Sequence, residues 1–453
     1  MAESREHFGS RFAVIMAMSG SAIGLGNIWR FPYLVGENGG AAFIIVYVLA
    51  SVFLSIPIFL SESIIGRRTH SNTFGAYDRL APGTGWRWAA LLTVLTPLII
   101  LSYYSVVGGW SIEYLAKALT FSFTGTDAQL ECMFGEFISS PWAPLAAHTV
   151  FLALCAAIVV LGVKSGIEKF SNISIPVLFL MVLIIMVYSI SLPGAESGVE
   201  YLVRPDFKSL GASGVLSAMG QSFFSLSLGV GTVLTYSSYV DRKENILVSG
   251  LGTAGFDLMF ALMAGVAVMS AVFAAGIVPG SGPGLIFETL PYVFNRMSSI
   301  SPVFSSVVAI LFFMTVLISA LTSAISLFEV GVAYCVEERK MKRKSSAAAI
   351  FIGVWLLGCL SSLSFGPLRD FKLLGEPFFS FLDMISSNFL MAAGALVFAI
   401  FVGWKMKRED VFDEFTNGGT IRFNAACFPA VYFLIRYAAP LAIAVIFITG
   451  LVL

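Results

Sequence analysis

Residues 19–31 read Ser-Gly-Ser-Ala-Ile-Gly-Leu-Gly-Asn-Ile-Trp-Arg-Phe and lie within the first long hydrophobic run of the chain. Gly20, Gly24 and Gly26 each weaken an α-helix, because glycine has no side chain to restrict the backbone. In lipid, an unpaired backbone amide or carbonyl costs on the order of several kcal/mol. A membrane helix is therefore interrupted only where it lines a cavity or binds something, and we expect an ion or substrate site at this break.

The composition indicates a membrane protein. Of the 453 residues, 57% are hydrophobic and 12% are charged, which is about half the charged fraction of a typical soluble protein. A helix that crosses a bilayer needs about 20 apolar residues, so the long uncharged runs predict membrane spans. We expect eleven spans, near residues 11–33, 40–66, 87–119, 144–162, 166–191, 214–239, 246–276, 304–337, 346–362, 377–404 and 425–452.

The distribution of positive charge predicts the orientation. If the spans alternate, most of the 27 Lys and Arg residues fall in loops on the side of the N-terminus. Basic loops stay in the cytoplasm, so the N-terminus is expected inside and, after eleven spans, the C-terminus outside. The five Cys residues are scattered and the basic residues belong to loops, which argues against a zinc site and against a nucleic-acid partner.

A second glycine cluster echoes the first. Leu228-Gly229-Val230-Gly231 interrupts the sixth expected span, five spans after Gly24-Leu25-Gly26 interrupts the first. Five is an odd number, so the second unit enters the membrane with the opposite orientation. Paired interruptions in corresponding segments are typical of transporters built from inverted repeats.

The stretch Gly-Ser-Ala-Ile-Gly-Leu-Gly-Asn-Ile-Trp-Arg-Phe-Pro-Tyr at 20–33, followed by Glu-Asn-Gly-Gly at 37–40, resembles the signature of the neurotransmitter:sodium symporters. The resemblance continues through 221–229 and 321–325 and covers nearly the whole chain. It implies an all-α membrane protein of the LeuT-like fold, with a 5+5 inverted repeat plus one additional helix and with helices 1 and 6 broken at mid-membrane. One transporter domain would fill 1–453, with repeats at 11–191 and 214–404 and an eleventh span at 425–452, where the family commonly has twelve.

The resemblance also implies a function. The protein would be a sodium-coupled symporter, not an enzyme, that imports a neutral, hydrophobic L-amino acid by alternating access across the plasma membrane of a bacterium. Its partners would be the small-molecule substrate, Na⁺ at two sites and the lipid bilayer. The preferred amino acid and the oligomeric state stay open at the level of sequence.

The substrate site follows from the chemistry of a broken helix, which exposes amides that attract an anion and carbonyls that attract a cation. By resemblance, the Leu25 and Gly26 amides and the Tyr104 hydroxyl would hold a carboxylate. The expected substrate residues are Ser21, Ala22, Leu25, Gly26, Ile100, Tyr104, Phe224, Ser225, Ser227, Val230, Ser323 and Leu327. None is charged, so we expect a neutral substrate. Val230 stands where the family's leucine transporter has Phe, which favours aromatic or long aliphatic side chains.

Sodium prefers hard oxygen ligands, which the resemblance places in two groups. The first sodium site would use Ala22, Asn27, Ser225 and Asp257, together with the substrate carboxylate. The second would use Gly20, Ile23, Ser319, Thr322 and Ser323. If the substrate is itself a ligand, sodium and substrate binding are linked reciprocally.

Asp257 departs from the family pattern. The leucine transporter has Asn at the matching position and Glu one turn later, where this chain has Ala261. Chloride-dependent relatives use chloride to supply negative charge there. An acid within a membrane span is by default a functional-site candidate. We therefore expect Asp257 to supply the charge directly, so that chloride is not required, and to take up a proton in the empty return step.

Gates are implied on both sides of the site. Arg30 and Asp383 would pair above Tyr104 and Phe224 at the outer side. Arg5 would pair with Glu337 near Tyr239 at the inner side. Gly166 and Pro176 in the fifth span carry a spacing at which some relatives unwind to release sodium, although a plain proline kink is the alternative.

Other classes of protein fit less well. A channel needs a continuous polar pore, whereas the polar residues here concentrate at mid-membrane. A membrane hydrolase needs a nucleophile and a base, and His7, His70 and His148 are expected outside the interiors of the spans. A proton-coupled amino-acid transporter of the same architecture is the closer alternative, and it would lack the second, hydroxyl-lined site.

Overall fold

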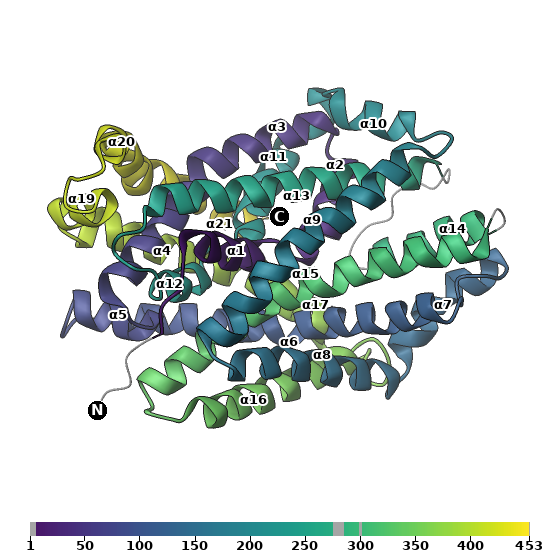
Figure 1. The fold of residues 1–453 in the computed structure, drawn as a ribbon, viewed down its shortest axis with the longest axis horizontal. Helices are drawn as coiled ribbons and strands as arrows, with labels where there is room; N and C mark the ends of the chain where they lie inside the picture. Colours follow the sequence, from purple (N-terminus) through teal and green to yellow (C-terminus); the bar gives the residue numbers. More distant parts are fainter. Residues whose placement is uncertain (1–5, 275–284, 299–300, 453) are drawn as a thin grey trace.

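The computed structural model describes residues 6–274, 285–298 and 301–452. Nearly all of this chain is helical (Figure 1). The helices, with short π-helical turns written η, are α1 Arg11–Ala22, η1 Gly26–Arg30, α2 Phe31–Glu37, α3 Ala41–Ala50, η2 Ser51–Ser55, α4 Ile56–Thr69, α5 Thr73–Leu80, α6 Trp86–Leu119, α7 Asp127–Ser139, α8 Ala143–Val160, η3 Val163–Glu168, α9 Lys169–Ile190, α10 Glu196–Val203, α11 Phe207–Ser225, α12 Thr232–Ser237, α13 Ile246–Ala274, α14 Leu285–Ser298, α15 Pro302–Glu337, α16 Arg343–Leu363, α17 Phe378–Met384, η4 Ile385–Leu390, α18 Met391–Ile400, η5 Phe401–Lys405, α19 Arg408–Thr416, α20 Arg422–Phe433, η6 Leu434–Ala438 and α21 Ala439–Val452. Strands β1 Lys372–Leu373 and β2 Glu376–Pro377 form one short antiparallel pair.

The long helices form one bundle with two distinct ends. Helix α15 packs along α6, and α1 lies against α9, α13 and α15. In Figure 1, α5, α19 and α20 lie at the left end of the bundle, and α7, α10 and α14 lie at the right end. Loops and short helices therefore gather at the two ends, as expected where the spanning helices leave a membrane.

The helices of the structure match the expected count of eleven spans in part. Within the described residues, nine helices are long and apolar enough to cross a membrane, and the bent pair of 11–22 and 26–37 makes a tenth. The remaining expected span, 214–239, corresponds to α11 and α12. Neither α11, with 19 residues, nor α12, with 6, is among the helices that are long and apolar enough to cross a membrane alone. The count of eleven therefore stays a prediction.

Both glycine clusters coincide with interruptions of helices. Helix α1 ends at Ala22, and the chain bends by 59° before continuing from Gly26 to Glu37. Helix α11 ends at Ser225 and α12 begins at Thr232. Between them, Gly229 and Gly231 have φ angles of +80° and +71°, which residues with a side chain rarely adopt.

The second interruption is held by two other elements. A Cβ atom on Gly229 would lie 2.0 Å from the Met391 carbonyl oxygen of α18, so only glycine fits there. The buried Glu62 carboxylate of α4 accepts hydrogen bonds from the Gly229 amide at 2.8 Å and the Leu234 amide at 3.3 Å. Glu62 thus pairs with one amide of the break, that of Gly229, and one amide of the first turn of α12, that of Leu234.

Candidate functional site

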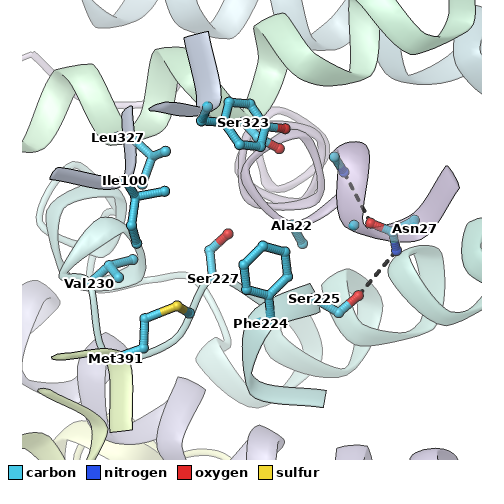
Figure 2. Close-up of a pocket in the computed structure, with 13 residues that line it drawn as sticks. Ala22, Asn27, Ile100, Phe224, Ser225, Ser227, Val230, Ser323, Leu327 and Met391 are labelled. Carbon is cyan, nitrogen blue, oxygen red and sulfur yellow. Dashed lines mark hydrogen bonds between the residues drawn. The ribbon is translucent and has the colours of Figure 1, made fainter. Parts of the chain in front are cut away.

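A small cavity of about 40 Å³ lies between the two interruptions (Figure 2). The expected substrate residues that line it are Ala22, Gly26, Ile100, Tyr104, Phe224, Ser225, Ser227, Val230, Ser323 and Leu327. Gly24, Asn27 and Met391 complete the lining. Leu25 lines the adjacent outer cavity instead. Ser21 lies behind the wall, where its carbonyl oxygen accepts a hydrogen bond from Ser227 at 2.9 Å.

The cavity has a polar side and an apolar side. Figure 2 shows Asn27 and Ser225 on one side, with Ile100, Val230, Leu327 and Met391 on the other. No charged side chain lines the cavity. An ionised ligand side chain would lose its hydration there without gaining a partner, so the apolar side favours an uncharged group.

The polar side begins at the break in the first helix. The Leu25 amide donates a hydrogen bond to the Tyr104 hydroxyl at 3.1 Å. A Cβ atom on Gly24 would lie 2.5 Å from Ser323 Oγ and 2.8 Å from the Tyr104 hydroxyl. Gly24 is therefore required for the close approach of the broken backbone to α6 and α15.

Asp257 lies within a buried polar cluster. Its carboxylate accepts hydrogen bonds from Asn27 Nδ2 at 2.7 Å, from Ser225 Oγ at 2.7 and 2.9 Å, and from the Tyr47 hydroxyl at 3.3 Å. Asn27 Oδ1 in turn accepts the Gly24 amide at 3.0 Å. The structure thus brings together the side chains expected at the first sodium site, and Ala22 lines the same cavity. Sequence reasoning missed Tyr47, because a tyrosine in an apolar run carries no distinguishing signal.

The residues expected at the second sodium site also come together. Thr322 Oγ1 lies 3.3 Å from the Ile23 carbonyl oxygen and 2.9 Å from that of Ser319. Ser323 Oγ lies 3.1 Å from the Ile23 carbonyl oxygen and 3.4 Å from that of Gly20. Two hydroxyls of α15 therefore face the carbonyls released where α1 ends. A cluster of uncharged oxygen atoms is the donor set that a hard cation such as Na⁺ prefers.

The outer side holds a second cavity of about 140 Å³. Tyr104 and Phe224 line both this cavity and the smaller one, so their rings separate the two. The Arg30 guanidinium lies 4.5 Å from the centre of the Phe224 ring. Arg30 and Asp383 line the same cavity, but no ion pair within 4.0 Å joins them among the described residues. The expected outer pair is thus present as two neighbouring residues and not as a closed bridge.

On the side expected to face inward, the structure describes two of the three expected gate residues, Glu337 and Tyr239. Arg5 lies outside the described residues, so its pairing with Glu337 stays a prediction. Glu337 accepts hydrogen bonds from the Asn72 amide at 2.7 Å and the Asn72 side chain at 3.0 Å. Tyr239 donates to Glu329 at 2.9 Å. Glu337 and Tyr239 both line a cavity of about 760 Å³ at this end of the bundle.

The fifth expected span is helical at the positions expected to unwind. Gly166 belongs to the π-helical turn η3, and Pro176 lies inside the continuous helix α9. A side chain at Gly166 would collide with the Ile158 carbonyl oxygen at 2.2 Å, so close packing explains that glycine here. Unwinding between the two residues stays a prediction about a different conformation.

One expectation about histidine is wrong. His148 was expected outside the interiors of the spans, but it lies within α8 and is fully buried. Its backbone sits close to α6, since a Cβ atom on Gly109 would lie 2.6 Å from the His148 amide nitrogen. The imidazole ring lies against Gly358 of α16, where a Cβ atom would come within 2.4 Å of its Cε1 atom.

A helical membrane bundle with two interrupted helices, a pocket between them and clustered oxygen ligands at the interruptions is the architecture of a secondary transporter of the LeuT fold. The crystal structure of MhsT in complex with L-phenylalanine has this fold and superposes with a TM-score of 0.90 at 38% identity, over 99% of this chain and 100% of that one.

Sequence comparisons define the family. The model of the sodium:neurotransmitter symporter family matches residues 5–134 and 138–453, and the chain belongs to this family. The uncharacterized sodium-dependent transporter YhdH of Bacillus subtilis is 38% identical, covering 97% of this chain and 96% of its own length. An uncharacterized sodium-dependent transporter of Haemophilus influenzae is 32% identical over 99% of both. The protein is thus a sodium-dependent membrane transporter of a small molecule.

Proposed function

We propose that the protein is a symporter that imports a neutral, hydrophobic L-amino acid, with aromatic side chains accepted, together with Na⁺ and without chloride. The observation that carries this proposal is the wall that the expected first sodium site shares with the substrate cavity. Ala22, Asn27 and Ser225 belong to the expected first sodium site and also line the cavity between the two interruptions. An amino acid whose carboxylate reached this wall would touch the ion, and binding of each would strengthen binding of the other.

The shape of the cavity supports an amino acid with an apolar side chain. The Leu25 and Gly26 amides and the Tyr104 hydroxyl lie at the polar side, where a carboxylate would be held. The substrate side chain would then point toward Ile100, Val230, Leu327 and Met391 (Figure 2). The relative MhsT was solved with L-phenylalanine, which agrees with this class of substrate. The cavity of about 40 Å³ must expand to hold such a ligand, and the Phe224 ring would move to allow it.

Asp257 supports independence from chloride. The carboxylate is buried, with 2% of its surface exposed, and three side chains donate hydrogen bonds to it. It supplies the negative charge that a bound chloride would otherwise provide beside the first sodium ion. In this arrangement Asn27 turns its NH₂ group toward Asp257. Sodium bound between them would displace this hydrogen bond and turn the amide oxygen inward.

The proposed transport cycle uses both sodium sites and both gates. Two Na⁺ ions would bind, one at each group of oxygen atoms, and the gates at Arg30 and Asp383 and at Arg5 and Glu337 would alternate. Release inward would use unwinding between Gly166 and Pro176. Asp257 would take up a proton in the empty return step. The protein would reside in the plasma membrane of a bacterium, with the N-terminus in the cytoplasm and the C-terminus outside.

The test is uptake of radiolabelled L-phenylalanine into proteoliposomes under an inward sodium gradient. We expect accumulation with Na⁺ in chloride or gluconate, and none when choline replaces Na⁺. Loss of uptake in gluconate would contradict chloride independence. Uptake that persists in choline with an inward proton gradient would instead support a proton-coupled transporter. The Thr322 and Ser323 hydroxyls that face α1 argue against that alternative.

A further inference from the structure

The crossing of η5 and η6, at the end of the bundle where α19 lies, brings two arginines together with several aromatic rings. A Cβ atom on Gly403 would lie 2.8 Å from Arg436 Cα, so glycine is required for this contact. Trp404 Nε1 donates a hydrogen bond to the Arg436 carbonyl oxygen at 2.9 Å, and the Tyr432 hydroxyl donates to that of Gly403 at 3.1 Å. Arg436 therefore lies level with Trp404, at the end of the bundle, although the sequence places it inside an apolar run.

The Arg436 side chain lies among rings and has few polar partners. Its guanidinium carbon lies 4.6 Å from the centre of the Trp404 ring, 5.5 Å from that of Tyr437 and 6.0 Å from that of Tyr432. Its Nε atom is buried and makes no hydrogen bond, and Nη1 reaches the Tyr432 hydroxyl only at 3.5 Å. Most of the five N–H donors of this side chain are thus unused.

Arg408, at the first residue of α19, approaches the same ring. Its guanidinium carbon lies 5.7 Å from the centres of both Tyr432 and Phe428. Two positive charges therefore share one tyrosine. Within the described part of the chain, neither arginine has a carboxylate within 4.0 Å.

Three acidic residues of α19, Asp410, Asp413 and Glu414, do not neutralise these arginines, because other arginines engage them. Asp410 pairs with Arg68 at 2.6 Å, and the buried Glu414 pairs with Arg67 at 2.5 Å. Glu409 is exposed. Lys405 and Lys407 are also exposed and add to the positive charge beside Arg408. The crossing thus has a local excess of positive charge, because Lys405, Lys407, Arg408 and Arg436 outnumber the exposed Glu409.

We propose that this crossing, defined by Arg408 and Arg436 with Trp404, Tyr432 and Tyr437, binds the headgroup of an anionic phospholipid. Guanidinium groups hold phosphate oxygens through paired N–H donors, and basic clusters beside a membrane span attract acidic lipids. The acyl chains would lie along the apolar helix α21.

Exposure at the crossing favours a lipid over a soluble phosphate. Trp404, Phe433 and Tyr437 are 57%, 58% and 47% exposed. Phe433 and Tyr437 lie on the span Arg422–Ile448, whose most apolar part is only 22% buried. Trp404 lies at the end of the neighbouring span Phe378–Lys405. Exposed tryptophan and tyrosine rings are typical of the interface between lipid headgroups and acyl chains. A free phosphate ion would make no use of this apolar surface.

Native mass spectrometry of the full-length transporter in detergent tests the proposal, with dioleoyl-phosphatidylglycerol and dioleoyl-phosphatidylcholine added separately. We expect the protein to retain phosphatidylglycerol in preference to phosphatidylcholine. The double variant Arg408→Gln/Arg436→Gln should bind phosphatidylglycerol about tenfold more weakly or worse, since each basic residue near a membrane surface contributes about 1 kcal/mol. Arg369→Gln, which removes an exposed charge from the turn before β1, should leave lipid binding unchanged.

Further measurements distinguish the remaining outcomes. Retention of sodium-dependent phenylalanine binding, or of the wild-type unfolding temperature without lipid, shows that the double variant is folded. Phosphatidylglycerol should raise the unfolding temperature of the wild type and not of the variant. Equal retention of both lipids, unchanged binding in the double variant, or displacement of phosphatidylglycerol by millimolar inorganic phosphate would each overturn the proposal.

Discussion

Asn27 Nδ2 donates a hydrogen bond to the Asp257 carboxylate at 2.7 Å, and this contact ties the interruption of the first helix to α13. Ser225, the last residue of α11, donates to the same carboxylate. Three segments that are distant in sequence therefore meet at one buried negative charge. Because the cluster also forms part of the cavity wall, a change at Asp257 should alter ion binding and substrate binding together.

Asp257→Asn keeps the shape of the side chain and removes its charge. We expect the sodium concentration for half-maximal phenylalanine binding to rise by about tenfold or more, since interactions with a buried charged group contribute roughly 1.5–3 kcal/mol. Binding to purified protein at a series of sodium concentrations measures this. Asp370→Asn, at a side chain that is 96% exposed, is the matched control and should behave as wild type. An unchanged sodium dependence in Asp257→Asn would exclude this carboxylate from the ion site.

Thr322→Val tests the second group of oxygen atoms. Valine has nearly the same shape but lacks the hydroxyl that lies 3.3 Å from the Ile23 carbonyl oxygen. We expect a several-fold increase in the sodium concentration needed for half-maximal uptake, because one ligand is lost. Thr315→Val is the control on the same helix, since its hydroxyl bonds only to the Leu311 carbonyl oxygen of α15. If the two variants respond equally, the Thr322 hydroxyl does not bind sodium.

Gly24→Ala tests the close approach at the first break. The added methyl group would meet Ser323 Oγ at 2.5 Å and the Tyr104 hydroxyl at 2.8 Å, so the broken backbone must move away from both. We expect phenylalanine binding to weaken by about tenfold or more. Gly220→Ala in α11 meets nothing within 4 Å and should bind normally. Wild-type affinity in Gly24→Ala would mean that the substrate does not use this side of the cavity.

Val230→Phe tests the apolar side of the cavity. Val230 is 1% exposed and lines the wall beside Ile100 and Met391, so a larger side chain takes up room that the substrate would need. We expect phenylalanine and tryptophan to lose roughly tenfold or more in competition assays, while smaller aliphatic amino acids lose less. Val248→Phe, at a 40% exposed position on α13, controls for the added bulk. A uniform loss for all amino acids would contradict a role of Val230 in side-chain selection.

The interruptions of the helices were predictable because their signal is local: clusters of glycine and polar residues stand within runs that are otherwise apolar. Thr322 and Ser323 followed from the resemblance, and the structure places both beside the end of α1. At the two interruptions, the local backbone chemistry of glycine decides where the helices end.

Features that depend on contacts between distant segments were missed. Met391 reaches the cavity because Gly229 and Gly394 let α18 approach the second break, and neither glycine signals this alone. The hydrogen bonds that the Glu62 carboxylate accepts from the Gly229 and Leu234 amides join segments more than 160 residues apart, so they become visible only in the folded chain. The open spacing of Arg30 and Asp383 depends on conformation, which a sequence motif does not specify.

The most direct test of the account measures binding of radiolabelled L-phenylalanine to the purified transporter at increasing sodium concentrations, with potassium replacing sodium. Because ion and substrate would share one wall, we expect no saturable binding in potassium alone, and an apparent affinity for phenylalanine that rises with sodium. Raising the phenylalanine concentration should equally lower the sodium concentration needed for half-maximal binding. Equal binding of phenylalanine with and without sodium would contradict the central claim.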